Sequence, residues 1–375
     1  SFIKVTGVTF INALPKRGVN LPRQTNRELN DPGWPFAARG PCGALTSNGS
    51  VATLLGGCVG DGVRMRRARW QPYLYLAPAA ILLLTFSIYP LFHAFNMSLF
   101  TKWGKPTQRV VGMANYNELL VTGGQFWDAL GVSVWYVAGT VPVALVLGFL
   151  VANLLFQKLR GLGLYRTIYF LPYVTSTVAA AMVWRWIFAP ESRGLANTVF
   201  SWFGRETLHW YYEPTGVFQL VAEGLGVELP GWAAGPSLAL VCVMLFSIWH
   251  ALGFDVVIFL AGLSAIPREM YEAAEVYGAN TRQKLWRITL PLLSPTLFFL
   301  IIISTIRSFQ TFNQIYVMTR QESIATTQNL PMLIFNNFQD GYYGLATATA
   351  VLLFVLMLGL TVVQMKVLGR RVHYY

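Results

Sequence analysis

Charged residues are scarce in this sequence. Asp, Glu, Lys and Arg together make up 12% of its 375 residues, about half of the roughly 25% found in soluble domains. Hydrophobic residues make up 54%, and the mean hydropathy is +0.48. A bilayer-spanning helix needs about 20 apolar residues, and several segments reach that length. The composition therefore predicts an integral membrane protein, because a soluble protein would have to bury all of these segments in one core.

Cysteine is also rare, and the motifs of several enzyme classes are absent. The three cysteines form no CxxC pair, so they predict neither a disulfide framework nor a metal site. No G-x-x-x-x-G-K-[ST] phosphate loop occurs, the nearest fragment being WGKP at residues 103–106. HExxH, GxSxG and DxxxD patterns are absent too, which leaves His250 with Asp255 as the single suggestion of a general base. We expect a chain that is not an enzyme and has no cofactor of its own.

Six apolar runs occur from Tyr73 onward, each long enough to cross a membrane. They cover about residues 73–100, 129–156, 165–189, 237–262, 290–318 and 345–368. The net charge of +12 does not indicate nucleic acid binding, because the basic residues lie at the ends of these runs. From Arg64 onward, 14 Lys and Arg residues flank the runs on the side of the N-terminus and 6 on the opposite side. By the positive-inside rule, both termini are expected in the cytoplasm.

Two segments stand apart from the apolar runs. Residues 1–64 are rich in Gly, Pro, Asn and Arg and lack the apolar core of a signal peptide. They are interpreted as a disordered extension or as a non-native segment preceding a start at Met65, with residues 65–375 as the membrane domain. Residues 190–236 form an extracytoplasmic insertion with an aromatic cluster, LHWYYEP, at 208–214. That cluster suits interfacial anchoring or a docking surface for an external partner.

A polar stretch interrupts the apolar half of the chain at about residues 264–289. Pro267 suits the first turn of a helix, Glu269 and Glu272 favour the positive end of its dipole, and Gly278 suits a left-handed cap. A second short helix then carries basic residues toward Pro291. The pattern predicts a helix–glycine–helix elbow on the cytoplasmic face. Its expected contact residues are Met270, Tyr271, Ala274 and Tyr277. The small side chains of Ala273 and Ala274 would permit close approach of another backbone.

Polar residues inside the apolar runs are candidates for a substrate site, because polar groups in a bilayer usually face a cavity or a partner. Four positions in the fifth run follow the i, i+3, i+4, i+7 spacing of one helix face: Arg307, Gln310, Thr311 and Gln314. The other candidates are Asn313, His250 and Asp255. Interhelical hydrogen bonding is the alternative role for each of them, and Asp255 with Arg307 is a candidate ion pair.

The polar stretch EAAEVYGANTRQKLWRITLPLLSP, beginning at Glu272, resembles the EAA loop of the membrane subunits of ABC importers. Flanking blocks, including LPYVTSTVAAAMVWRWIFAP from Leu171 and SFQTFNQIYVMT from Ser308, are similar to sugar and glycerol-phosphate permeases of the maltose-transport type. The resemblance runs from about residue 65 to the C-terminus. It implies an all-α, polytopic bundle of six transmembrane helices with a cytoplasmic coupling helix.

The resemblance also implies a function and a set of partners. The chain would be the permease subunit that moves a carbohydrate (an oligosaccharide, a monosaccharide or a polyol phosphate) across a bacterial inner membrane by alternating access. Its partners would be a second permease subunit in a heterodimer, two ATPase subunits that hold ATP and Mg, and an extracytoplasmic solute-binding protein. A stand-alone secondary transporter or channel is the alternative, although we find no internal inverted repeat that would favour it.

Residue roles follow from the same resemblance. Coupling to the ATPase would involve Glu272, Ala273, Ala274 and Gly278, with Met270 and Tyr277 beside them. Tyr277 departs from the family pattern, which usually has Asp before the glycine. Substrate contacts, by contrast, are expected from the polar positions of the spans and not from the resemblance: first from Gln310 and Asn313, and then from Arg307, Gln314, His250 and Asp255.

Overall fold

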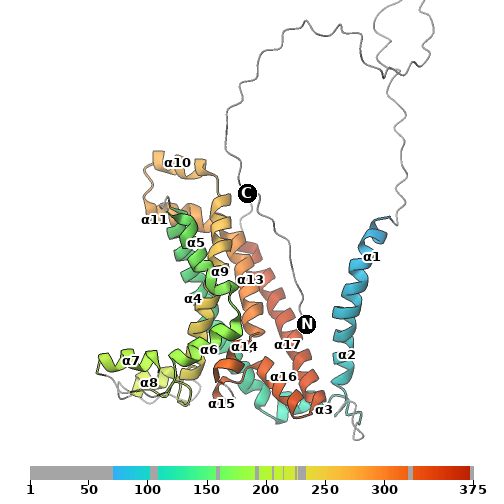
Figure 1. Cartoon of the computed structure of the whole chain (residues 1–375). Helices are drawn as coiled ribbons and strands as arrows, with labels where there is room; N and C mark the ends of the chain where they lie inside the picture. Colours follow the sequence, from blue (N-terminus) through green and yellow to red (C-terminus); the bar gives the residue numbers. More distant parts are fainter. Residues whose placement is uncertain are drawn as a thin grey trace, which may run out of the picture. The chain divides into compact units, whose positions relative to one another are not determined.

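The protein is a bundle of helices in a computed structural model (Figure 1). The structure describes residues 71–101, 109–157, 161–190, 194–204, 207–213, 215–223, 226, 234–319 and 324–371. Within these ranges there is no β-strand, only the isolated bridges of Phe100 with Val110 and of Gly216 with Ser237. The predicted all-α class is therefore confirmed. The prediction for residues 1–64 lies outside the described residues.

Four helical segments are long and apolar enough to cross a membrane without interruption. The first joins α1 (Gln71–Leu83) through a π-helical turn to α2 (Tyr89–Met97), and the others are α4 (Gln125–Phe156), α9 (Leu238–Ala265) and α17 (Tyr343–Val367). Two bent pairs raise the number of spans in the described part of the chain to as many as six. The predicted apolar runs thus coincide with helices, although two of them are not straight.

The third predicted span, 165–189, is broken in the middle. It consists of α5 (Leu162–Val174) and α6 (Thr177–Ile187), whose axes differ by 93°. Thr175 and Ser176 have extended backbone angles between the helices. The Thr175 hydroxyl donates to the Pro172 carbonyl at 2.6 Å, so a side chain replaces part of the helical hydrogen bonding there. A local side-chain hydrogen bond therefore accompanies the end of the helix, and a hydropathy average does not detect such a bond.

The fifth predicted span, 290–318, is also interrupted. The segment Thr281–Leu292 meets α13 (Ser294–Phe309) at an angle of 63°, and α13 ends nine residues before the run does. The carbonyl of Thr311 accepts a hydrogen bond from the side chain of Asn329 at 2.5 Å, and α14 (Asn313–Thr319) begins two residues later. The predicted stripe at 307, 310, 311 and 314 is therefore wrong as a single helix face, because the backbone leaves the helix within it.

The shorter helices connect or cover the spans. They are α3 (Ala114–Asn117), α7 (Leu195–Trp202), α8 (Val217–Glu223), α10 (Arg268–Val276), α11 (Thr281–Lys284), α12 (Leu290–Leu292), α15 (Ile324–Thr327) and α16 (Leu330–Gln339). In the insertion at residues 190–236, α7 and α8 extend to one side of the bundle (Figure 1).

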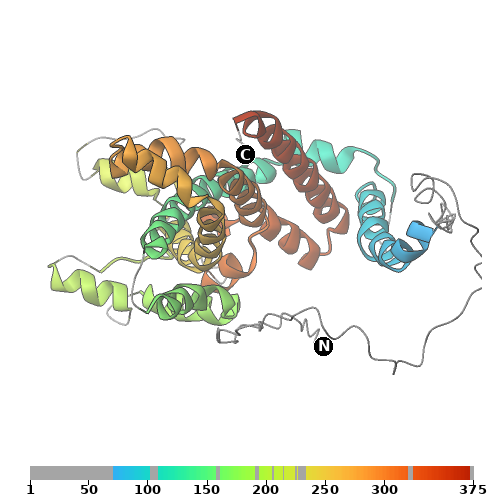
Figure 2. The same cartoon turned by 90° about the horizontal axis from the view of Figure 1, so that it is seen from above.

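The core lies between α4 and α9, which run side by side in both views (Figure 1 and Figure 2). Leu145, Phe259 and Leu300 belong to a buried cluster shared by α4, α9 and α13. Close approach of the central pair depends on Gly148, where an added Cβ would lie 2.9 Å from the Cβ of Asp255. In contrast, no residue of the strongly apolar window in Tyr73–Met97 is buried, although α2 contacts α17.

Candidate functional site

The polar stretch forms the expected elbow. Helix α10 is followed by Gly278, whose φ of +75° lies in the left-handed region, and then by α11. Backbone N–H groups of Gly278 and Ala279 donate to the carbonyls of Glu275 and Ala274, both at 2.9 Å, and close the end of α10. The predicted left-handed conformation of Gly278 is confirmed. Pro267 is the N-cap residue and not part of the first turn, since its ψ of 134° is extended.

One side of the elbow is open to the surroundings. Tyr277 is 91% exposed and Met270 is 46% exposed, while Glu272 and Ala273 are also exposed and Ala274 is half-buried. Gly278 is exposed as well, so all six predicted coupling residues are at least partly accessible on α10 and its C-terminal cap. This surface combines a carboxylate, two small residues and two larger apolar side chains, which suits docking in a cleft of another protein.

Tyr271 points the other way, contrary to its prediction as a contact residue. Its hydroxyl shares a hydrogen bond of 3.1 Å with the hydroxyl of Thr289, and its ring packs against the buried cluster of α4, α9 and α13. A salt bridge of 2.9 Å between Lys284 and Glu275 joins the two arms of the elbow. Because α10 is held at these points to the segment that enters α13, a force on the exposed face of α10 reaches the spans directly.

A second group of residues gathers where α5, α6, α9 and α13 meet. Arg307 donates to the hydroxyl of Tyr173 at 3.3 Å, and its guanidinium carbon lies 4.2 Å from the ring centre of Phe254. The rings of Tyr173 and Phe254 are 5.4 Å apart, and that of His250 is 6.0 Å from Tyr173. His250 also lies 3.5 Å from the Thr177 hydroxyl at the start of α6. Tyr173, just before the break after α5, thus lies beside Arg307, and Thr177, just after it, lies beside His250.

This arginine cluster (Arg307, Tyr173, Phe254, His250 and Thr177) has the chemistry of a polar ligand site. The Arg307 side chain is exposed, and His250 is half-buried. A guanidinium stacked on aromatic rings keeps its fork of N–H donors available for hydroxyl, carboxylate or phosphate oxygens. Sequence reasoning found Arg307 and His250 but missed Tyr173, because a Tyr in an apolar run reads as an interfacial anchor.

Asp255 does not join this cluster. Its side chain is 1% exposed and lies against Gly148 of α4, and its Oδ2 atom has no hydrogen-bond partner among the described residues. Within the same residues no direct salt bridge joins Asp255 to Arg307, although the guanidinium still interacts electrostatically with the buried carboxylate. Asp255 is a core residue of the α4–α9 contact, and its position gives no support to a substrate contact in this conformation.

The other three candidates are dispersed. Gln310 is exposed and lines a largely apolar groove of about 370 Å³ between α13 and α17, and Asn313 is exposed at the start of α14. Gln314 is half-buried and donates, at 3.5 Å, to the hydroxyl of Tyr136. The structure therefore brings together only Arg307 and His250 of the six predicted substrate residues.

Tyr136 is the centre of a buried hydrogen-bond network that the sequence did not reveal. Its hydroxyl donates to Ser247 at 2.7 Å and accepts from Thr311 at 3.4 Å, and its side chain is 1% exposed. Asn329, itself 1% exposed, donates to the carbonyl of Thr311 and so fixes the break after α13. This network stabilises the non-helical backbone between α13 and α14, a few residues after Arg307 in the sequence.

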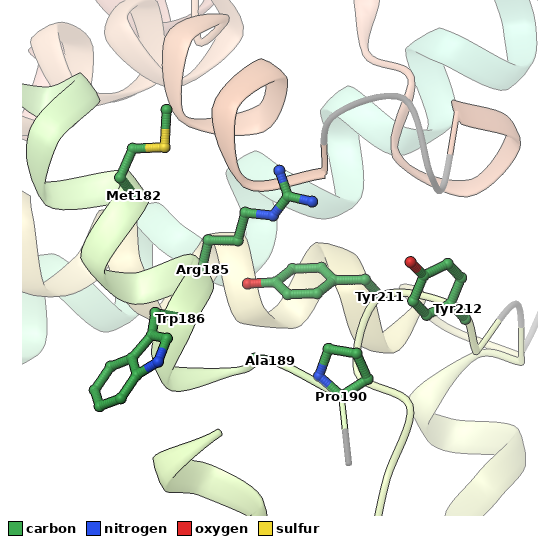
Figure 3. A pocket seen from close by; sticks show the side chains of 7 residues that line it. All are labelled: Met182, Arg185, Trp186, Ala189, Pro190, Tyr211 and Tyr212. Carbon is green, nitrogen blue, oxygen red and sulfur yellow. The ribbon is translucent and has the colours of Figure 1, made fainter. Parts of the chain in front are cut away.

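The described parts of the insertion at residues 190–236 are also held together by hydrogen bonds. Asn197 accepts hydrogen bonds from the Trp210 indole at 2.9 Å and from the Leu208 N–H at 3.1 Å, which ties α7 to the aromatic cluster. A pocket of about 360 Å³ lies between this cluster and the end of α6. Figure 3 shows Arg185 extending from α6 toward the side of the pocket formed by Tyr211 and Tyr212. No group of three metal-ligating side chains occurs in the described part of the chain.

The chain is similar to known proteins over most of its length. Residues 144–374 match the family model described as "Binding-protein-dependent transport system inner membrane component". The chain is 31% identical over 296 residues to the trehalose/maltose transport system permease protein MalF of Thermococcus litoralis, covering 79% of this chain and 92% of the relative. It is 30% identical over 307 residues to the sn-glycerol-3-phosphate transport system permease protein UgpA of Agrobacterium fabrum, covering 81% and 96%.

A solved structure has the same fold. The crystal structure of a bacterial ABC transporter involved in the import of alginate contains a chain that superimposes with a TM-score of 0.64 at 23% identity, over 80% of this chain and 96% of the other. The match extends over almost the whole length of the compared proteins. The family model covers both the arginine cluster and the elbow. This chain belongs to the binding-protein-dependent transport system inner membrane component family, and it is a multi-pass membrane permease.

Proposed function

We propose that this chain is the permease subunit of a binding-protein-dependent ABC importer that translocates a carbohydrate by alternating access, driven by separate ATPase subunits. The observation that carries the proposal is the elbow of α10, Gly278 and α11. It presents an accessible docking face, and it is tied to the spans through Tyr271 and Thr289. Such an element can transmit movement of another protein to the bundle, whereas a stand-alone transporter has no need of it.

The arginine cluster supports a hydroxyl-rich substrate. Aromatic rings cover the apolar faces of a sugar, while Arg307, Tyr173 and His250 supply hydrogen bonds to its hydroxyls. A guanidinium also suits the phosphate of a polyol phosphate. The relatives named for trehalose, maltose and glycerol 3-phosphate fall in this range of chemistry. Gln310 and Asn313, both exposed near the end of α13, would reach the substrate from the same segment in a different state of the transport cycle.

The proposed partners are a second permease subunit, two ATPase subunits that carry ATP and Mg, and an extracytoplasmic solute-binding protein. The span Tyr73–Met97 supports a second membrane subunit, since most of its apolar side chains stay exposed even though α2 contacts α17. The distribution of basic residues supports a topology with both termini in the cytoplasm of a bacterium. In that topology the elbow faces the ATPase, and the insertion at 190–236 faces the binding protein.

Reconstitution tests the proposal. The chain is co-expressed with the permease, ATPase and binding-protein genes that neighbour its own, and uptake of labelled maltose, trehalose and glycerol 3-phosphate into proteoliposomes is measured with and without ATP. We expect ATP-dependent uptake of at least one of them that also requires the binding protein. The Glu272→Lys and Gly278→Pro variants should still insert but lose the co-purifying ATPase. Uptake driven by an ion gradient without the ATPase would instead establish a secondary transporter.

A further inference from the structure

A small pocket lies beside the elbow, on the segment that leads from Gly278 into the membrane. It has a volume of about 280 Å³ and is lined by Asn280, Arg282, Gln283, Trp286 and Arg287. It is separate from the exposed face of α10, because α10 precedes Gly278 in the sequence and the pocket residues follow it. None of the residues assigned above to coupling or substrate contact lines it.

The polar side chains of this pocket offer mainly hydrogen-bond donors, because each carboxamide oxygen already accepts a backbone hydrogen bond. The Oδ1 atom of Asn280 accepts from the N–H of Gln283 at 2.8 Å, and the Oε1 atom of Gln283 accepts from the N–H of Asn280 at 2.9 Å. This reciprocal capping box fixes the orientation of both amides. Their NH₂ groups remain as donors, beside two guanidinium groups and an indole N–H. A pocket of this kind selects an acceptor-rich anion.

Within the described part of the chain, the two arginines of the pocket have no acidic partner. Lys284, which lies between them in the sequence, forms the salt bridge with Glu275. Among the described residues, neither Arg282 nor Arg287 takes part in an ion pair. Two positive charges therefore face a pocket without a counter-ion, and burial of an anion there would satisfy both.

Trp286 indicates where this anion comes from. Its side chain is 63% exposed, and it belongs to the π-helical turn Leu285–Thr289, directly before the apolar α12 and α13. An exposed indole among arginines at the start of a span lies at the level of lipid headgroups. Basic pockets at this depth attract the anionic lipids of the cytoplasmic leaflet.

We propose that the pocket formed by Arg282, Arg287 and Trp286 binds the phosphate headgroup of an anionic phospholipid. The bound lipid holds the π-helical turn at the membrane surface. Because Thr289 at the end of that turn is bonded to Tyr271 of α10, the lipid also steadies the elbow. The inference requires only that the chain lies in a membrane, so it does not depend on the proposed carbohydrate transport.

Native mass spectrometry of the purified full chain tests this inference. The protein in detergent micelles is titrated with phosphatidylglycerol or phosphatidylcholine, and the number of retained lipids is counted. We expect preferential retention of phosphatidylglycerol by the wild type. The Arg282→Gln/Arg287→Gln variant should bind it about 30-fold more weakly, which corresponds to about fivefold for each lost charge. Lys284→Gln is the matched control, because it removes one charge from the same helix but outside the pocket, and it should change retention by less than about twofold.

Three results would overturn the proposal. Equal retention of the two lipids by the wild type would show that the pocket does not recognise anionic headgroups. An equal loss in Lys284→Gln would mean that overall charge, and not the pocket, attracts the lipid. Displacement of phosphatidylglycerol by millimolar inorganic phosphate, with no effect of Trp286→Ala, would assign the pocket to a soluble anion. A weaker retention of phosphatidylglycerol in Trp286→Ala, without displacement by phosphate, supports the lipid.

Discussion

Gly253 allows α5 to approach α9 closely, and its replacement by alanine is expected to displace part of the arginine cluster. A Cβ at this position would lie 2.8 Å from the Tyr169 carbonyl oxygen, 3.0 Å from the Tyr173 Cβ and 3.2 Å from the Phe170 Cα. All three atoms belong to the backbone or its first side-chain carbon, so no rotamer change can make room. The helices themselves have to separate.

The size of the effect follows from these distances. Carbon–oxygen contacts are comfortable at about 3.3–3.6 Å, so α5 must move by about 0.5 Å or more. Overpacking of this kind costs about 1–3 kcal/mol. Alanine is also a better helix former than glycine by about 1 kcal/mol, which offsets part of the cost. Because Tyr173 is among the displaced residues, its 3.3 Å hydrogen bond with Arg307 lengthens as well.

A matched control removes the helix-propensity contribution. Gly131 in α4 is also helical, but an added Cβ would meet nothing within 4 Å. The melting temperatures of Gly253→Ala and Gly131→Ala are compared in the same detergent, by light scattering or intrinsic fluorescence. The first should melt about 2–10 °C below the second. In the reconstituted importer, Gly253→Ala should raise the KM for uptake, while Gly131→Ala should leave it unchanged.

Equal melting temperatures for the two variants would refute this reasoning. They would show that α5 and α9 are further apart than the structure indicates, or that α5 yields without cost. A loss of stability without any change in KM would support the close contact of α5 with α9 at Gly253. It would also show that this contact does not influence substrate binding at the arginine cluster.

Three further predictions follow from single contacts. Arg307→Lys should raise the KM for uptake about two- to fivefold, because lysine cannot both stack on Phe254 and bond to Tyr173; an unchanged KM would remove Arg307 from the site. Tyr136→Phe should lower the stability by about 1–2 kcal/mol in thermal unfolding, because the buried Ser247 and Thr311 lose their shared partner. Asn197→Ala should make the insertion at 190–236 sensitive to limited proteolysis while the spans stay protected, since it removes the bonds to Trp210 and Leu208; uniform resistance would contradict this role.

Features that depend on neighbouring residues could be predicted from the sequence. Scarce charge and long apolar runs indicated a membrane protein because each span must satisfy its own backbone and cover it with apolar side chains. The conformation of Gly278 followed from helix-end chemistry, since glycine adopts a positive φ without steric cost. The common face of Met270, Ala274 and Tyr277 followed from their helical spacing of four and three residues along α10 and its C-cap.

The breaks in the spans and the composition of the arginine cluster were decided only by the tertiary structure. The backbone can leave the helix after Phe309 because the buried side chain of Asn329 satisfies the carbonyl of Thr311, a contact between separate elements that no local pattern predicts. Tyr173 contacts Arg307 across 134 residues of sequence, where α5 packs closely against α9 at Gly253. Hydropathy and periodicity describe how one helix meets its surroundings. Which polar groups meet inside the bundle depends on where the helices break and how closely they pack.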